Sequence, residues 1–158
     1  MKLKYLLTVS ALIITQAVLA APTLPAKQPV MLEKITTPGF VMAEYAVNKS
    51  CVIQANGKLV VNYKLGTLSS KREDVLKLSL TAIKDAIDKA ALGVLTAGPS
   101  IADTGRVEYA AYQPQADRSL KKIVLWQTGE IAPETNDAPE AKLLRNFIDL
   151  NCGDPLLY

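Results

Sequence analysis

Ser119 and Lys122 have the spacing of the Ser-x-x-Lys motif, in which a lysine activates a serine nucleophile for acyl transfer. Residues three apart meet on a helix, but along a strand they lie on opposite faces. The segment from Leu120 is rich in β-forming residues, so we expect a strand there. We therefore interpret this match as accidental.

Gly93 and Gly98 have the spacing of the two glycines in a phosphate-binding loop. Pro99 and Ser100 follow them, where such a loop needs a lysine and a hydroxyl residue for phosphate and magnesium. The segment also follows an expected helix, whereas a phosphate loop follows a strand. We interpret these glycines as the end of that helix.

Carboxylates remain as candidates for acid/base chemistry, and the chain contains no histidine. Histidine is the usual general base near neutral pH and a common metal ligand, so its absence excludes Ser-His-Asp, Cys-His and His-ligated zinc chemistry. A glycosidase-type site needs two carboxyl groups about 5 to 10 Å apart, and the spacing of the acids does not show whether any two meet. The candidates are Glu44, Glu108, Glu130, Asp149 and Asp154.

From these motifs we therefore assign no catalytic residue, no metal ligand and no cofactor-binding residue. The sequence favours a non-enzymatic protein, with a carboxylate-based enzyme as an alternative.

Cys51 and Cys152 are the only cysteines. An even count in an exported protein favours a disulfide, whereas a redox thiol would need a CxxC pair or a nearby histidine. We predict a Cys51–Cys152 bridge that ties the C-terminus to the middle of the fold.

The first half of the chain predicts a hairpin followed by a helix. Phe40 to Val47 and Cys51 to Ala55 are rich in β-forming residues, and Asn56-Gly57 before Lys58 to Leu65 predicts a type I′ hairpin. Ser70 and Glu73 have the spacing of a capping box, which predicts a helix from Ser70 to about Leu92. Its apolar stripe comprises Leu76, Leu80, Ile83, Ile87 and Ala91.

The second half predicts the same order of elements. Val107 to Tyr112 and Leu120 to Gln127 predict a strand pair, and a loop from Thr128 to Ala138 leads to a helix that starts near Pro139 and ends near Asn151. The expected apolar side of this helix comprises Leu143, Leu144, Phe147, Ile148 and Leu150.

This order predicts a two-layer α+β fold, with an antiparallel sheet of about four strands in hairpin-helix-hairpin-helix order. Two helices are expected to pack on one face of that sheet. Residues 39–158 would form this single domain.

Residues 1–20 read as a secretory signal peptide, with Lys2 and Lys4 before an apolar run and a small-residue exit. Cleavage is expected after Ala20, with Ala21 as the alternative. The apolar run is shorter than the roughly 20 residues that span a bilayer. Residues 21–38 contain several prolines and read as a flexible lead-in, with a docking arm as the alternative. The expected location is the periplasm or outside the cell.

Removal of the leader takes away two of the 18 basic residues and none of the 15 acidic ones, which leaves a net charge of +1. A nearly neutral domain gives no electrostatic reason to expect nucleic acid as a partner. We expect a partner protein, no integral membrane span after cleavage, and an oligomeric state that the sequence leaves open.

The favoured function is that of a binding or inhibitor-like protein that acts through loops on a disulfide-clamped scaffold. A structural or assembly component of the cell envelope is the alternative. The candidate interaction residues on two polar loops are Gln113, Pro114, Gln115, Asp117, Arg118, Gly129, Glu130 and Pro133.

Overall fold

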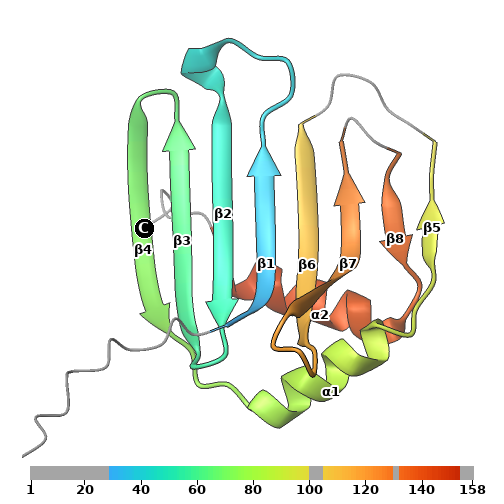
Figure 1. Ribbon diagram of the computed structural model, residues 1–158. Helices are drawn as coiled ribbons and strands as arrows, with labels where there is room; N and C mark the ends of the chain where they lie inside the picture. The colour runs from blue at the N-terminus through green and yellow to red at the C-terminus, as the bar shows by residue number, and fades with distance from the viewer. Residues whose placement is uncertain (1–28, 100–104, 130–131, 154–158) are drawn as a thin grey trace, which may run out of the picture.

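The strands of this computed structural model form one antiparallel sheet in the order β4-β3-β2-β1-β6-β7-β8-β5 (Figure 1). The structure describes residues 29–99, 105–129 and 132–153. The strands are β1 (Val30–Thr37), β2 (Val47–Gln54), β3 (Lys58–Leu65), β4 (Leu68–Val75), β5 (Leu95–Ala97), β6 (Arg106–Pro114), β7 (Leu120–Thr128) and β8 (Glu134–Asn136). The helices are the 3-10 turn η1 (Ala43–Tyr45), α1 (Leu80–Ala90) and α2 (Pro139–Asn151).

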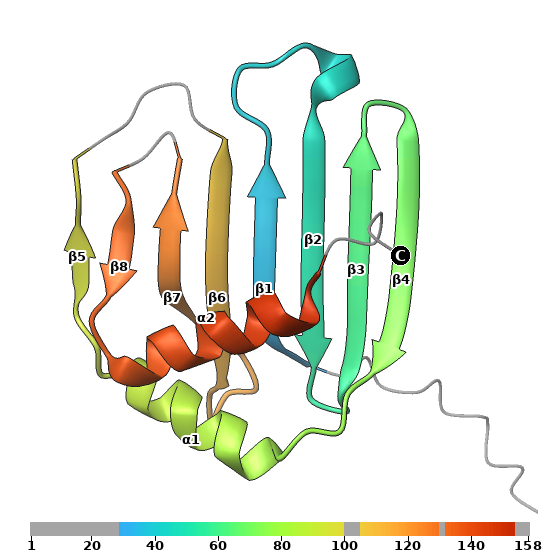
Figure 2. The same cartoon turned by 180° about the vertical axis from the view of Figure 1, so that it is seen from behind.

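Both α-helices lie on one side of the sheet (Figure 2), which we call the helix face; the other side is the far face. Alternation along the strands decides which side chains enter the core. Cys51 and Ile53 of β2 pair with Val61 and Leu59 of β3, and all four are buried on the helix face. The helices contribute Ile87, Ala90, Ala141, Leu144 and Ile148 to the same core.

The expected sheet of about four strands in hairpin-helix-hairpin-helix order is wrong, since the described chain contains an eight-stranded sheet. The main reason is the segment Ser70–Glu73, which was expected to start a helix. It lies within β4, which pairs with β3 from Leu65↔Leu68 to Lys58↔Val75. Because β4 is at the edge of the sheet, charged residues that also suit a helix are tolerated there, and strand pairing overrides the capping pattern.

Helix α1 begins ten residues after the expected cap, at Leu80, and ends at Ala90. Its buried side chains are Ile87 and Ala90, while Ile83 packs against the core from a partly buried position. The expected helical spacing is thus present, but Leu76 lies before the helix.

Strand β1 occupies the centre of the sheet, between β2 and β6, although its residues fall in the expected Pro-rich lead-in. Leu32 is fully buried and Met31 nearly so, and an irregularity in register between Val30 and Leu32 accommodates the extra residue. Burial of these apolar side chains outweighs the local effect of the flanking prolines. Phe40–Ala46, expected as part of a strand, instead forms a loop that contains η1.

Two three-residue strands, β5 and β8, pair with each other at the other edge of the sheet. Neither was expected, because each is too short to show alternation. The buried Asn136 holds this region together: its amide donates to the carbonyls of Ala90 and Val124, and its carbonyl accepts from the Ala138 N–H. A Cβ at Gly93 would lie 2.0 Å from Asn136 Oδ1, so this glycine permits a close approach after α1.

The hairpin between β2 and β3 is confirmed, but its turn is not type I′. That turn needs positive φ at both central residues, whereas only Gly57, with φ of 83°, has one here. The Gly57 N–H donates to the Gln54 carbonyl at 2.9 Å. The turn is therefore longer than the two-residue type I′ turn, and it ends in a glycine in the left-handed conformation. The strand pair β6–β7 and helix α2 also form within one or two residues of the expected bounds.

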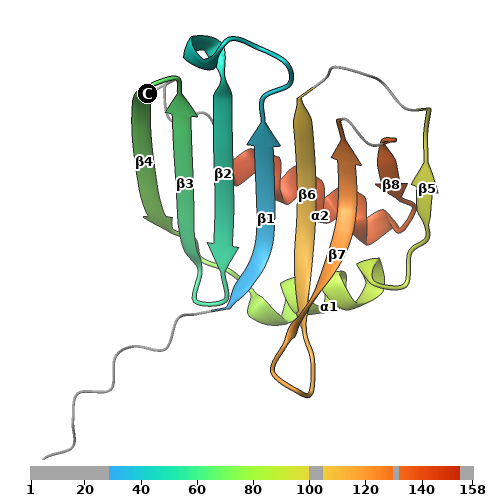
Figure 3. The same ribbon diagram turned by 45° about the horizontal axis from the view of Figure 1, so that its top comes forward.

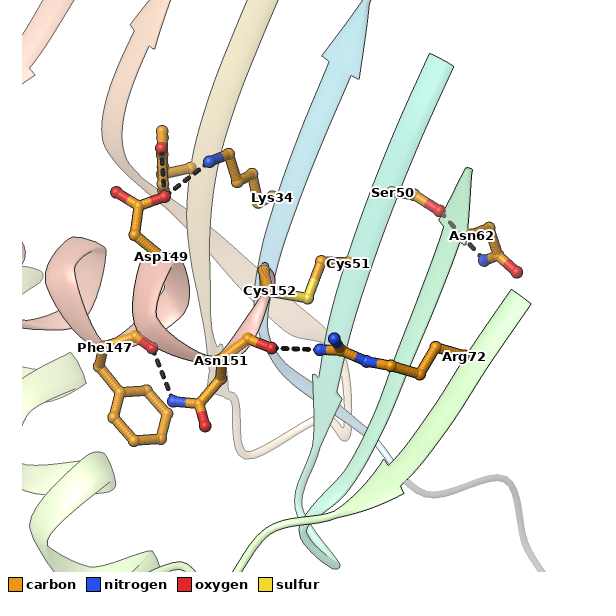
Figure 4. Close-up of a disulfide and its surroundings, with 10 residues drawn as sticks. Lys34, Ser50, Cys51, Asn62, Arg72, Phe147, Asp149, Asn151 and Cys152 are labelled. Carbon is orange, nitrogen blue, oxygen red and sulfur yellow. Dashed lines mark hydrogen bonds and ion pairs between the residues drawn. A yellow bond between two sulfur atoms is a disulfide. The ribbon is translucent and has the colours of Figure 1, made fainter. Parts of the chain in front are cut away.

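The predicted disulfide between Cys51 and Cys152 is confirmed (Figure 4). It joins β2 to the residue that ends α2, and the two cysteines are only 1% and 3% exposed. Beside it, the Arg72 guanidinium on β4 donates to the Asn151 carbonyl at 2.6 Å. A cation is favourable at a helix C-terminus, so Arg72 and the disulfide fasten the same end of α2 to the sheet.

The leader, its cleavage position and residues 21–28 of the lead-in lie outside the described residues, as do Glu130 and Asp154.

Candidate functional site

The two polar loops expected to act in recognition lie at opposite ends of the sheet (Figure 3). We call the end with the β1–β2 loop the upper end, as drawn in Figure 1. The β6–β7 turn lies at the lower end, whereas Gly129 and Pro133 lie between β7 and β8 at the upper end. The structure therefore does not bring the two sets together in one surface.

The β6–β7 turn is held by its own hydrogen bonds. The Gln115 N–H donates to the Ser119 carbonyl, and the Arg118 N–H donates to the Gln115 carbonyl. Asp117 accepts from the Ser119 N–H at 2.9 Å, and hydrogen bonds from Ser119 lower the pKa of its carboxyl. Gln113 and Pro114 end β6, where the Gln113 amide donates to Asp88 on α1. These hydrogen bonds explain why polar residues occur here, because they stabilise a tight turn.

Two of the candidate acids, Glu108 and Asp149, lie on opposite faces of the sheet. Glu108 pairs with Ile35 on the far face, while Asp149 lies on α2 and contacts the helix face. They therefore do not form a carboxylate pair. Glu44 lies in η1 at the upper end.

Asp149 is the centre of a polar cluster on the helix face (Figure 4). Its Oδ1 accepts from Lys34 Nζ at 2.6 Å and from the Tyr109 hydroxyl at 2.7 Å. Arg145 places its guanidinium over the rings of Tyr109 and Trp126, at 5.4 and 4.7 Å from their centres. The two rings meet edge to face at 5.8 Å, an arrangement that stabilises packing between aromatic side chains.

This cluster is held in its ordinary charge state. Burial alone would lower the pKa of Lys34, but hydrogen bonds with Asp149 and Tyr109 outweigh it and raise the pKa. Burial raises the pKa of the Tyr109 hydroxyl. Burial also opposes ionisation of Asp149, but Lys34 and Tyr109 outweigh it and lower its pKa. A general base needs a pKa near the working pH, so these shifts favour a structural role.

A second polar network lies on the far face around Glu108, which is only 4% exposed. Arg106 on the same strand and Lys122 on β7 both form ion pairs with its carboxylate. The Lys122 of the Ser-x-x-Lys match is therefore an ion-pair partner of Glu108. Nearby, the Tyr112 hydroxyl donates to Glu33, and burial raises the pKa of that tyrosine. Paired charges of this kind satisfy a buried carboxylate.

Within residues 29–99, 105–129 and 132–153, no group of three or more histidine, cysteine, aspartate or glutamate residues is placed to hold a metal ion.

The upper end carries a set of exposed apolar side chains, and the sequence analysis assigned all of them except Leu68 to a strand. The set comprises Phe40, Val41, Met42, Tyr45 and Leu68, and we call it the apolar tip. Phe40 is 97% exposed, Met42 71%, Leu68 70% and Tyr45 66%. Pro38-Gly39 directly after β1 was the sequence signal that β pairing stops there.

The backbone of the apolar tip is braced from two sides. The Tyr45 N–H donates to the Met42 carbonyl at 2.9 Å within η1. The Gly66 N–H, in the β3–β4 turn, donates to the Ala46 carbonyl at 3.3 Å. The loop that carries Phe40 is thereby held beside the β3–β4 turn, which directly precedes Leu68 (Figure 1). Backbone hydrogen bonds therefore fix the position of the apolar tip on the fold.

In comparisons with protein families, with curated proteins and with solved structures, nothing matches this chain. No helix in the described part of the chain is long and apolar enough to cross a membrane.

Proposed function

We propose that this chain is an exported, non-enzymatic binding protein that contacts a partner protein through the apolar tip. The observation that carries this proposal is the exposure of Phe40, Met42, Tyr45 and Leu68 together at one end of the sheet. Solvent-exposed apolar patches are characteristic of interaction sites, and aromatic residues commonly dominate the binding energy of an interface.

The proposed location rests on the leader-like residues 1–20 and on the disulfide. Disulfides persist in oxidising compartments and are rare in the cytosol of most organisms. Edman sequencing of the protein purified after export would test the location, and we expect a mature N-terminus at Ala21. An unprocessed chain retained in the cytosol would overturn this part of the proposal.

The two alternatives from the sequence receive less support. A carboxylate-based enzyme would need two acids in one site, whereas Glu108 and Asp149 lie on opposite faces. An assembly component that adds a strand to a sheet edge would use β4, the long edge strand. Lys71, Arg72, Glu73 and Asp74 lie on that strand, and charged edge strands oppose strand addition.

Site-specific photo-crosslinking tests the proposed contact. Met42 is replaced by p-benzoylphenylalanine in the full chain expressed in its native host, and the export compartment is irradiated. We expect a discrete protein adduct that is lost in a Phe40→Ser background. Phe40 is almost fully exposed, so this substitution leaves the thermal unfolding midpoint unchanged.

Leu92 and Leu150 supply matched control positions, because they are 83% and 84% exposed and lie outside the apolar tip. The photo-reactive residue at either position should not give the same adduct. The proposal is contradicted if all three positions label the same proteins, if Phe40→Ser leaves the adduct intact, or if only lipid is labelled.

A further inference from the structure

A shallow depression of about 480 Å³ lies on the far face, directly below the apolar tip. Strand pairing places two rows of side chains in it. The row nearer the tip is Asn48, Lys64 and Ser69, and the next row is Ser50, Asn62 and Lys71. We call these residues the basin.

The basin presents hydrogen-bond donors and positive charge. Its side chains are amides, hydroxyls and ammonium groups, and among the described residues that line the depression none is acidic. Lys64 is exposed and forms no ion pair with any described residue. Lys71 does pair with Glu73 at 2.5 Å, but Glu73 lies outside the depression.

The spacing of these groups suits an extended chain. Neighbouring strands are about 4.8 Å apart, and side chains on one face recur about every 7 Å along a strand. Asn62 Nδ2 already donates to Ser50 Oγ at 3.1 Å, which orients the amide across β2 and β3. Lys64 and Lys71 lie on adjacent strands and adjacent rows, so they can contact carboxylates on successive parts of one segment.

The basin is continuous with the apolar tip through the chain itself. Asn48 is the second residue of β2, the strand that begins directly after the loop that carries Phe40. A partner that covers the Phe40 side of the tip can therefore reach the basin along β2.

We propose that the basin binds an acidic, extended peptide segment of the same partner protein whose apolar residues cover the tip. This inference rests on the proposed function, because it assigns a charge and a conformation to that partner. Charge complementarity of this kind fixes register and accelerates association, and the apolar tip supplies the desolvated contact.

An NMR titration of the mature, disulfide-bonded protein with N-acetylated hexaglutamate amide tests the basin. We expect saturable shifts at the amides of Asn48 and Asn62 and at Lys64. Lys64→Gln should weaken binding about threefold to fivefold, as for loss of one exposed ion pair, and added salt should weaken it further. Lys142→Gln is the matched control, because Lys142 is an exposed lysine on α2, and it should leave the affinity unchanged.

Three outcomes of the titration would overturn the proposal. The first is the absence of shifts in the basin, and the second is an equal loss of affinity in Lys64→Gln and Lys142→Gln. The third is tighter binding of hexagalacturonate than of hexaglutamate, because the basin would then prefer an acidic saccharide.

The link to the partner is tested separately by the crosslink from position 42. Lys64→Gln combined with Lys71→Gln should lower the adduct yield, and Lys142→Gln should not. An unchanged yield would refute a shared partner. The titration does not depend on the tip, so Phe40→Ser should retain hexaglutamate binding even if the proposed function fails.

Discussion

Lys34 Nζ on β1 lies 2.6 Å from Asp149 Oδ1 on α2, and this ion pair joins residues 115 positions apart. Asp149 lies three residues before Cys152. The last turn of α2 is therefore bound to the sheet by both an ion pair and a disulfide. The Lys34 side chain is 20% exposed and that of Asp149 45% exposed, which places the pair at the boundary of the core.

Asp149→Asn should reduce stability at neutral pH and have no effect in strong acid. The pKa of Asp149 is lowered in the folded protein, so its bonds stabilise the fold above the ordinary value of 3.8 and are lost as pH falls through the depressed value. Because water screens a half-exposed carboxylate, we expect about 1 kcal/mol or less. Urea unfolding across the acid range measures the difference.

Glu140→Gln is the control for this experiment, since its ion pair with Lys89 is longer, at 3.6 Å. It should change stability less than Asp149→Asn. An Asp149→Asn variant with the same acid dependence as the wild type would contradict the assignment.

Cys51→Ala combined with Cys152→Ala should lower the free energy of unfolding by about 2 to 5 kcal/mol. The bridge spans 101 residues, and for a loop of this length the loss of unfolded-chain entropy gives about 4.7 kcal/mol as an upper-end value. Urea unfolding of the oxidised protein and the double variant measures the loss. If reduced wild type and double variant differ widely in stability, then the cavities left by the buried thiols, and not the bridge, cause part of the effect.

Arg106→Met combined with Lys122→Met should destabilise the fold by about 3 to 5 kcal/mol at neutral pH, because it leaves the buried carboxylate of Glu108 without countercharge. Urea unfolding at neutral pH measures this loss of stability. Adding Glu108→Gln should recover most of it. The assignment is refuted if the triple variant is no more stable than the double variant.

Gly57→Ala should lower the free energy of unfolding by about 2 kcal/mol or more, because both the backbone conformation and a close contact disfavour a side chain there. The residue has a φ of 83°, and its added Cβ would lie 2.5 Å from the Leu76 carbonyl oxygen. Gly153→Ala is the control, since nothing lies within 4 Å of a Cβ at that position. Thermal unfolding compares the two, and equal midpoints would show that the hairpin turn tolerates a side chain.

The sequence was sufficient to predict an element of the fold where its local pattern agrees with its tertiary contacts. Helix α2 follows from Pro139 and helical apolar spacing, and Leu144 and Ile148 are indeed buried, while Leu143 and Leu150 remain exposed. The Cys51–Cys152 bridge follows from the count of cysteines and the expected export. The β2–β3 and β6–β7 hairpins follow from β-forming runs separated by turn residues.

Strand pairing decided the remainder of the fold. Ser70–Glu73 satisfies a helix cap locally, but pairing with β3 gives it a full ladder of backbone bonds as an edge strand. Val30–Thr37 reads as a Pro-flanked lead-in, yet β2 and β6 pair with it on both sides and bury Leu32. A local pattern does not include these cross-strand partners, so it predicts neither strand.

The candidate site depended on tertiary structure even more strongly. The residue types of Phe40–Val41–Met42 are those of a strand, and only the end of β pairing at Thr37 leaves them exposed. The basin combines side chains from three strands, and its lack of acidic groups follows from register. Composition, cysteine pairing and local periodicity can be read from the sequence. The exposure of a side chain and its cross-strand neighbours depend on which strands pair, so only the tertiary structure decides them.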